Sequence, residues 1–196
     1  MQARALRRSL VVIAVTAAAA VPAAASTTGS THTIATVYEA FSYHGVVIPH
    51  ATVADGYCWE SSNVTRRVDA WRCFVGNTIF DPCFSSEFAN NVVCPKPWND
   101  TAVEINLTKP LPKASNRASP SLQLQPWAIQ TASGANCVFA SGASSLVGGK
   151  RLNYFCSAKL GLWGYPNRKS RTWTILSAPP TAKKLSHRTS ILRAWM

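Results

Sequence analysis

The chain has 196 residues and a formal net charge of +12. The charge is one-sided: residues 26–104 hold 8 acidic and 4 basic side chains, whereas residues 105–196 hold 13 Lys and Arg and no acidic residue. The two parts carry −4 (4 − 8) and +13, a polarity that favours contact with polyanions. No apolar run after residue 25 approaches the roughly 20 residues of a membrane-spanning helix, which excludes further spans of that kind.

The first 25 residues are typical of a secretory signal peptide. Three arginines precede an apolar run over residues 10–21, and three alanines that end at Ala25 follow. A charged start, a short apolar core and small residues form a signal that a peptidase removes. An uncleaved anchor is disfavoured because the run is too short for about 30 Å of hydrocarbon. Cleavage leaves 171 residues (196 − 25) with a charge of +9 (17 − 8), and we expect a soluble chain that is secreted or associated with the cell envelope.

The predicted secondary structure is almost entirely strand. Short runs rich in Val, Ile, Thr and aromatic residues are bounded by Gly, Pro, Asn or Ser, which is typical of all-β proteins. The runs are Thr33–Tyr38, Val46–Ile48, Ala70–Val75, Ala102–Leu107, Trp127–Thr131, Leu152–Cys156 and Thr172–Leu176. The best helical candidate is the short segment Ser85–Asn91. We therefore predict a mainly β, antiparallel, disulfide-stapled domain.

The basic tail Lys183–Met196 has two interpretations. As a short interfacial helix it would bring Leu185, Leu192 and Trp195 to one side. As a strand over Thr189–Trp195 it would close the sheet. We favour the strand.

All six cysteines lie after the signal peptide, at Cys58, Cys73, Cys83, Cys94, Cys137 and Cys156. An even number in an exported protein indicates three disulfides, although the sequence alone does not determine their pairing. The spacing favours sequential pairing, because each bond then closes a hairpin-sized loop. A zinc site would need clustered ligands at short spacing, and no C-x-x-C occurs. We expect neither a metal nor a cofactor.

Composition divides the mature chain into three parts. Residues 26–108 form an acidic β half with two disulfides, residues 109–126 a Pro- and Ser-rich linker, and residues 127–196 a basic β half with one disulfide. In each half an aromatic residue stands two positions before the second cysteine of a pair, on the same strand face: Trp71 before Cys73, and Tyr154 before Cys156. This pattern favours two pseudo-repeated β units packed together. Shared hairpin composition is the alternative.

A succession of short motifs runs through both halves. It comprises W-R-C at 71–73, D-P-C-F at 81–84, V-C-P at 93–95, P-W at 97–98, P-W-A-I at 126–129 and N-Y-F-C at 153–156. The succession resembles a family of small secreted actinobacterial proteins with six cysteines and no established activity. The resemblance covers about residues 55–176 and includes all six cysteines. It implies export across a bacterial membrane into an oxidising cell-envelope space, and it carries over no catalytic residue.

Signatures of nucleophilic or phosphate chemistry are weak. The segment Gly142–Leu146 fails the G-x-S-x-G pattern at its last position, and Gly148–Lys150 lacks the rest of a phosphate-binding loop. His44 and His50, with Asp55 nearby, would supply a base and its orienting group. Ordinary surface or partly buried histidines are the favoured interpretation.

Glycoside hydrolysis needs two carboxylates that face a cleft, and the candidates are Glu60, Asp69 and Asp81. Asp69 stands among arginines, which indicates local charge pairing. Asp81 precedes Pro82, which indicates a turn. A small secreted envelope hydrolase that uses Asp69 or Asp81 is therefore an alternative to a binding protein.

The basic half interleaves cations with aromatic side chains. Cations attract anionic sugars and phosphate polymers, while aromatic faces stack on rings. The predicted ligand-binding residues are Lys150, Arg151, Tyr154, Trp163, Arg168, Lys169, Arg171 and Trp173. Two other interpretations remain open: the tryptophans fill the core, or the acidic half balances the cations within the molecule.

We therefore expect a secreted, non-catalytic binding protein. Its expected partner is an anionic polysaccharide, a phosphate polymer or an anionic lipid surface, with nucleic acid bound only non-specifically. A protein-interaction module that mates head-to-tail with another copy is a further alternative. The sequence does not decide the oligomeric state.

Overall fold

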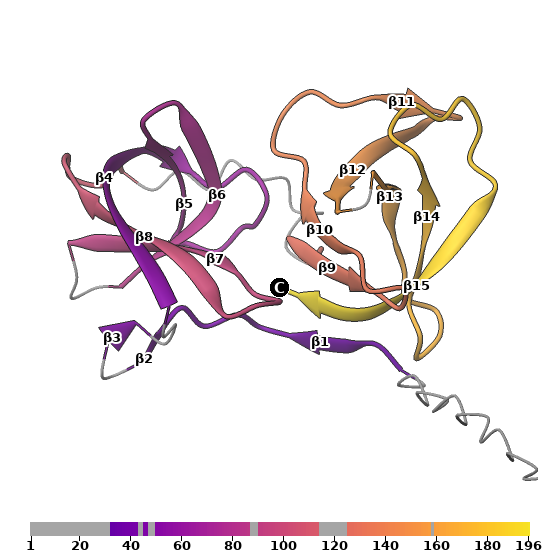
Figure 1. Cartoon of the computed structure of the whole chain (residues 1–196), viewed down its shortest axis with the longest axis horizontal. Coiled ribbons are helices and arrows are strands. Elements are labelled where there is room, and N and C mark those ends of the chain that lie inside the picture. Colours follow the sequence, from indigo (N-terminus) through magenta and orange to yellow (C-terminus); the bar gives the residue numbers. More distant parts are fainter. Residues whose placement is uncertain (1–31, 43–44, 47–49, 87–89, 114–124, 158) are drawn as a thin grey trace, which may run out of the picture.

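The computed structural model describes residues 32–42, 45–46, 50–86, 90–113, 125–157 and 159–196 (Figure 1). The predicted signal peptide and most of the predicted linker lie outside these residues. The described part of the chain is built from strands and contains no helix, so the mainly β prediction is confirmed. The helical candidate is wrong at both ends, because Ser85 ends one strand and Asn91 begins the next. No helix capable of spanning a membrane occurs among the described residues.

Five strands form a closed barrel, here called the first barrel. They are β4 (His50–Ser61), β5 (Ala70–Val75), β6 (Thr78–Ser85), β7 (Asn91–Lys96) and β8 (Thr101–Leu107). Each strand pairs antiparallel with the next. Because the number of strands is odd, β8 runs in the same direction as β4, and the two close the barrel in parallel. Gly56 is required in β4, since a Cβ there would lie 2.2 Å from the carbonyl oxygen of Phe74.

Six strands form a second closed sheet, here called the second barrel. They are β9 (Ala128–Thr131), β10 (Asn136–Phe139), β12 (Lys150–Cys156), β13 (Gly161–Asn167), β14 (Thr174–Ala178) and β15 (His187–Trp195). Neighbouring strands are antiparallel, and β15 closes the barrel against β9. The short β11 (Leu146–Val147) pairs with the start of β12. The prediction of a closing strand in the basic tail is confirmed.

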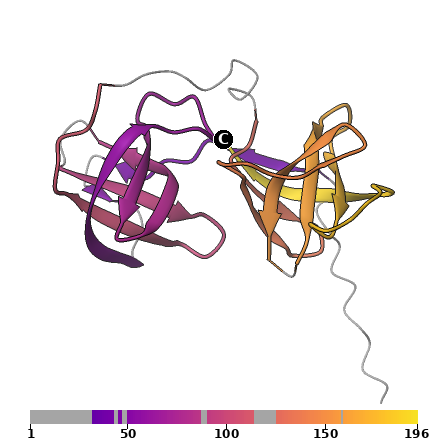
Figure 2. The same cartoon turned by 90° about the horizontal axis from the view of Figure 1, so that it is seen from above.

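The N-terminal segment connects the two barrels. Strand β1 (Ile34–Thr36) pairs in parallel with residues Arg193–Trp195 of β15, and Figure 1 shows it below β15, with the chain continuing from it toward the first barrel. The short hairpin of β2 (Phe41–Ser42) and β3 (Gly45–Val46) follows beside the first barrel. Figure 2 shows the two barrels side by side, with the C-terminus between them. The acidic half therefore contributes its first strand to the sheet of the basic half.

The three disulfides are the sequential pairs that the spacing favours: Cys58–Cys73, Cys83–Cys94 and Cys137–Cys156. Each staples two neighbouring strands. Trp71 packs in one buried cluster with both disulfides of the first barrel, and Tyr154 packs in another with Cys137. The barrels are nevertheless not copies of one topology. The first closes in parallel and the second antiparallel, and Cys137–Cys156 joins the second and third strands of its barrel rather than the first and second.

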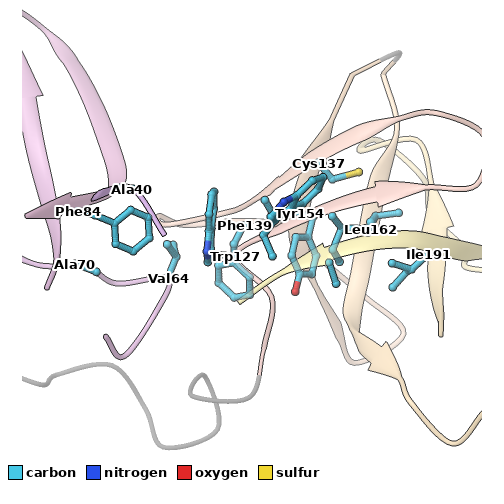
Figure 3. Close-up of a cluster of buried hydrophobic side chains, with 14 of the residues drawn as sticks. Ala40, Val64, Ala70, Phe84, Trp127, Cys137, Phe139, Tyr154, Leu162 and Ile191 are labelled. Atoms are coloured by element: carbon cyan, nitrogen blue, oxygen red, sulfur yellow. The ribbon is translucent and has the colours of Figure 1, made fainter. Parts of the chain in front are cut away.

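One hydrophobic cluster extends across the junction between the barrels. Trp127, directly before β9, is 1% exposed and lies between Phe84 of the first barrel and Phe139 and Tyr154 of the second (Figure 3). Its ring centroid is 5.9 Å from that of Phe84 and 5.6 Å from that of Tyr38. Burial of a shared tryptophan fixes the barrels against each other, because separation would expose it to water.

Candidate binding groove

A concave site of about 440 Å³, here called the groove, lies on the second barrel. It is lined by Gly149, Lys150, Arg151 and Asn153 at β12, by Trp163, Gly164, Tyr165 and Asn167 of β13, by Leu176 of β14 and by Arg188 of β15. Four strands of one sheet therefore contribute to it. A volume of this size is typical of sites for small molecules or for one or two units of a polymer.

A glycine hairpin places Lys150 in the groove. Val147 pairs with Lys150, and the two residues between them, Gly148 and Gly149, have positive φ angles of 54° and 69°. Such angles form the tight two-residue turn that glycine adopts without steric cost. The Lys150 side chain then passes Gly164, where an added Cβ would lie 3.6 Å from its Cδ. This glycine pair, which resembles part of a phosphate loop in sequence, is a hairpin turn.

Two irregularities in the sheet meet at the groove. The β12–β13 register shifts between Leu152 and Tyr154, so Asn153 occupies a bulge. The β13–β14 register shifts beyond Trp163, where Gly164 has a φ of +70°. The Asn153 Nδ2 donates a hydrogen bond of 2.9 Å to the Gly164 carbonyl and joins the two irregularities. Bulges redirect side chains, which explains why Asn153 lines the groove while Tyr154 enters the core.

An apolar cluster supports the groove from below. Leu152, Trp163 and Ala178 are buried together, and Leu176 and Leu185 pack against them. Trp163 is 0% exposed although it lines the groove, so it forms a wall beneath the accessible surface. This cluster is separate from the barrel core, because it lies on the other side of the sheet from Leu162 and Ile175.

Tyr165 is the accessible aromatic residue of the groove. Its side chain is 46% exposed, and its ring is nearly parallel to that of Phe139, at 18° and a centroid distance of 6.4 Å. Phe139 in turn meets the buried ring of Tyr154 edge-on at 5.1 Å. A chain of aromatic contacts therefore holds Tyr165 from the core outward.

The cations of the groove differ in whether they already form contacts within the protein. The Arg151 Nη2 donates to the carbonyls of Ala140 and Gly142 at 3.0 and 2.6 Å, so its guanidinium holds a neighbouring loop. Lys150 and Arg188 are exposed, and neither forms an ion pair with any described residue. Both charges remain available to a ligand.

The other predicted ligand-binding residues lie elsewhere. Tyr154 is fully buried and donates its hydroxyl to the Pro126 carbonyl at 2.8 Å, which corrects its prediction as a ligand-binding residue. The same correction applies to Trp163, whose ring belongs to the apolar cluster below the groove. In both cases the aromatic side chain fills the space that sheet packing leaves, which excludes a ligand from its faces.

Arg168, Lys169 and Arg171 lie outside the residues that line the groove. The Arg168 guanidinium lies 4.4 Å from the centre of the Trp173 ring, and its partial burial lowers its pKa. Trp173 is occupied by this contact and by packing against the shared core. Lys169 and Arg171 are exposed, but neither lines the groove.

The groove residues that sequence reasoning missed include Asn153, Tyr165 and Arg188. Arg188 lies more than 35 positions after Lys150 in the sequence, and only the pairing of β14 with β15, in which Leu176 faces Arg188, brings it to the site. The bulge at Asn153 has no clear sequence signal. Tyr165 lies in the same cation- and aromatic-rich region as Trp163, so the argument that selected Trp163 applied equally to Tyr165.

The candidate catalytic carboxylates are engaged in ion pairs. Asp69 pairs with Arg67 at 2.6 Å, as its sequence neighbours indicate. Glu60 and Asp81 both approach Arg72, at 3.0 and 3.8 Å. These contacts stabilise the outer part of the first barrel and leave each carboxylate with a structural partner.

Asp81 is not a turn residue, which corrects the sequence interpretation. It lies inside β6, and its side chain is 2% exposed. Its oxygens accept hydrogen bonds from the Ser62 hydroxyl at 2.5 Å and from the Asn63 backbone N–H at 3.2 Å. Burial raises its pKa to about 6, although these hydrogen bonds and Arg72 act in the opposite direction. Asp81 therefore anchors the loop after β4.

The part of the histidine hypothesis that pairs His50 with Asp55 is wrong. His50 and Asp55 lie on one uninterrupted segment of β4, opposite Thr101 and Asn106 of β8. Five residues of extended strand span about 16 Å, which is too far for a hydrogen bond. His44 lies outside the described residues. Among the described residues, no three His, Cys, Asp or Glu side chains gather where they could hold a metal ion.

Comparison of the chain with protein-family models, with curated proteins and with solved structures finds no match.

Proposed function

We propose that the protein is a secreted, non-catalytic binding protein that holds an anionic polymer in the groove of its second barrel. The observation that carries this proposal is the pair of exposed, unpaired cations, Lys150 and Arg188, at a concave site. The chain has no acidic residue after Glu104, so no side-chain carboxylate of the second barrel can neutralise them. Their charges act on an approaching anion without competition from a neighbouring partner.

Internal balance of charge by the acidic half receives little support. The ion pairs between described side chains join Arg67 to Asp69, and Arg72 to Glu60 and Asp81. All of these residues belong to the first barrel or its loops. Lys150, Lys169, Arg171 and Arg188 form no ion pair with a described residue of that barrel. The cations of the second barrel are therefore not paired with the acidic half and can attract a polyanion.

The test compares two double variants of the exported, oxidised protein. Lys150→Ser with Arg188→Ser removes two charges from the groove, and Lys169→Ser with Arg171→Ser removes two exposed charges outside it. Binding to isolated envelope fractions and to soluble polyanions is measured across a salt series. We expect the groove variant to lose most of the affinity and to reduce the log–log salt slope by roughly one per lost contact.

The control separates a site from general attraction. Equal losses in both double variants would show that net charge alone drives binding. Binding that changes neither with salt concentration nor in either double variant would refute the proposal. A protein partner would then be the alternative, and sedimentation would detect it as an increase in mass.

A further inference from the structure

The β11–β12 hairpin carries the most exposed of the large hydrophobic side chains in the described part of the chain. Leu146 is 71% exposed, whereas its neighbour Val147 packs against the apolar cluster beneath the groove. Successive side chains of a strand point to opposite faces, which explains the difference. Single exposed leucines are common on protein surfaces, so the surroundings of Leu146 decide whether it has a function.

The hairpin holds Leu146 in place before any partner arrives. The Leu152 backbone N–H donates to the carbonyl of Ser145, the residue directly before Leu146, at 2.9 Å. Arg151, which lies opposite Leu146 in the register, donates to two carbonyls of the preceding loop. Leu146 therefore projects from a structure that is already formed, and binding through it needs little further ordering of the chain.

A second loop reaches the same end of the barrel. Ala182 and Leu185, between β14 and β15, pack against the same apolar cluster as Val147. The Ala182 backbone N–H donates to the Pro179 carbonyl at 2.9 Å, which closes a turn in this loop. Figure 1 shows the loop passing beside β11 at the upper end of the second barrel. Residues 145–150 of the hairpin and residues 179–186 of the loop are here called the barrel tip.

The barrel tip is cationic around its apolar residues. Lys183 and Lys184 belong to the loop, and Lys150 follows the glycine turn of the hairpin. All three lysines are exposed, and none forms an ion pair with a described residue. Because no acidic residue follows Glu104, no side chain of the second barrel opposes their charge. An exposed leucine and unpaired cations therefore share one end of the molecule.

We infer that the barrel tip docks on an anionic lipid surface, with Leu146 inserted below the headgroups and the three lysines against them. Anionic headgroups attract each nearby Lys by an amount worth about fivefold in affinity. The boundary of the acyl chains removes the Leu146 side chain from water, which adds a hydrophobic contribution. A soluble polyanion attracts the lysines but offers Leu146 no apolar phase. The lipid surface is the partner that uses both features.

This docking goes beyond the proposed binding of a polymer in the groove. The tip borders the groove at Gly149 and Lys150, but Leu146, Lys183 and Lys184 do not line it. Variants of these last three residues therefore test docking without altering the groove.

The experiment measures sedimentation of the intact oxidised protein with vesicles. Mixed phosphatidylglycerol–phosphatidylcholine vesicles are compared with phosphatidylcholine vesicles and with soluble dextran sulfate at one ionic strength. We expect binding to the mixed vesicles and little to phosphatidylcholine alone. Leu146→Ser keeps the net charge and should weaken binding to the mixed vesicles about tenfold, with dextran sulfate binding unchanged. Lys183→Ser with Lys184→Ser should weaken vesicle binding by more than about tenfold.

A matched control and a spectroscopic signature separate insertion from general attraction. Val68, in the loop between β4 and β5, is 68% exposed, so Val68→Ser removes an equally exposed apolar side chain from the first barrel. It should bind the mixed vesicles as the wild type does. Leu146→Trp should also bind, and its tryptophan emission should shift to shorter wavelength with the mixed vesicles but not with dextran sulfate.

The outcomes separate docking from the proposed function. Unchanged vesicle affinity in Leu146→Ser, an equal loss in Val68→Ser, or no binding to the mixed vesicles would each overturn docking, even where dextran sulfate binds. Polyanion binding that survives the double substitution of Lys150 and Arg188 would overturn the proposed function and leave docking through Leu146 standing.

Discussion

Asp81 provides a sharp test of the electrostatics of the first barrel. Its carboxyl is buried in β6, where it accepts hydrogen bonds from Ser62 and Asn63 and lies 3.8 Å from the Arg72 Nε. Desolvation outweighs these favourable contacts and raises the pKa from 3.8 to about 6. The substitution Asp81→Asn keeps the size of the side chain and removes its titration.

The magnitude follows from the difference in pKa between the folded and unfolded states. A rise in the pKa of Asp81 from 3.8 to about 6 corresponds to roughly 3 kcal/mol. The folded protein binds this proton more tightly than the unfolded chain, so the stabilisation is fully present below pH 3.8 and is lost as the pH rises through about 6. Between pH 4 and 7 the free energy of unfolding of the wild type should therefore fall by about 2 kcal/mol relative to Asp81→Asn, since a small part of the effect is already lost at pH 4.

Denaturant unfolding at several pH values, followed by tryptophan fluorescence, measures this difference. Other titrating groups cancel in the comparison, since they are common to both proteins. Ser62→Ala serves as a second test, because it removes a hydrogen bond that lowers the pKa of Asp81. The loss of stability between pH 4 and 7 should therefore be larger in Ser62→Ala than in the wild type. Parallel stability curves for the wild type and Asp81→Asn between pH 4 and 7 would refute the reasoning.

Two further predictions concern the architecture. Trp127→Ala removes the side chain that the two barrels share and is expected to cost about 3–5 kcal/mol and to split a single unfolding transition into two, which calorimetry would show; one unchanged transition would mean that the barrels are coupled by other contacts. Gly56→Ala places a Cβ 2.2 Å from the Phe74 carbonyl oxygen and is expected to lower the melting temperature by several degrees, whereas the exposed Gly142→Ala, with open space around it, is the matched control.

Local sequence patterns determined the fold class and several elements of this protein. The run Ala70–Val75 is β5 with the predicted bounds, because a β-branched and aromatic stretch ended by Gly76 needs no distant information. Cysteine spacing favoured the sequential disulfides without determining them, and the strand in the tail was the preferred of two interpretations. The one-sided charge was also readable from the sequence, and it led to the half of the chain that carries the groove.

The proline at position 82 led to a wrong local interpretation. Asp81 and Pro82 read as a turn, but they lie in β6 where the β5–β6 register shifts opposite Arg72. No regular ladder bond is required at that irregularity, so a proline is tolerated there. The position of a register shift depends on the partner strand, and a single stretch of sequence does not contain it.

Tertiary structure alone decided which charges and rings face a ligand. Tyr154 and Trp163 stand among cations in the sequence, yet a bulge and the packing of the sheet bury both. Arg188 reaches the groove because β15 pairs with β14, and β1 crosses to the second barrel because the end of β15 offers it a free edge. Residue types and short-range periods set the strands, but strand pairing across long sequence distances sets the surface, and that pairing is an interaction between segments rather than a property of either one.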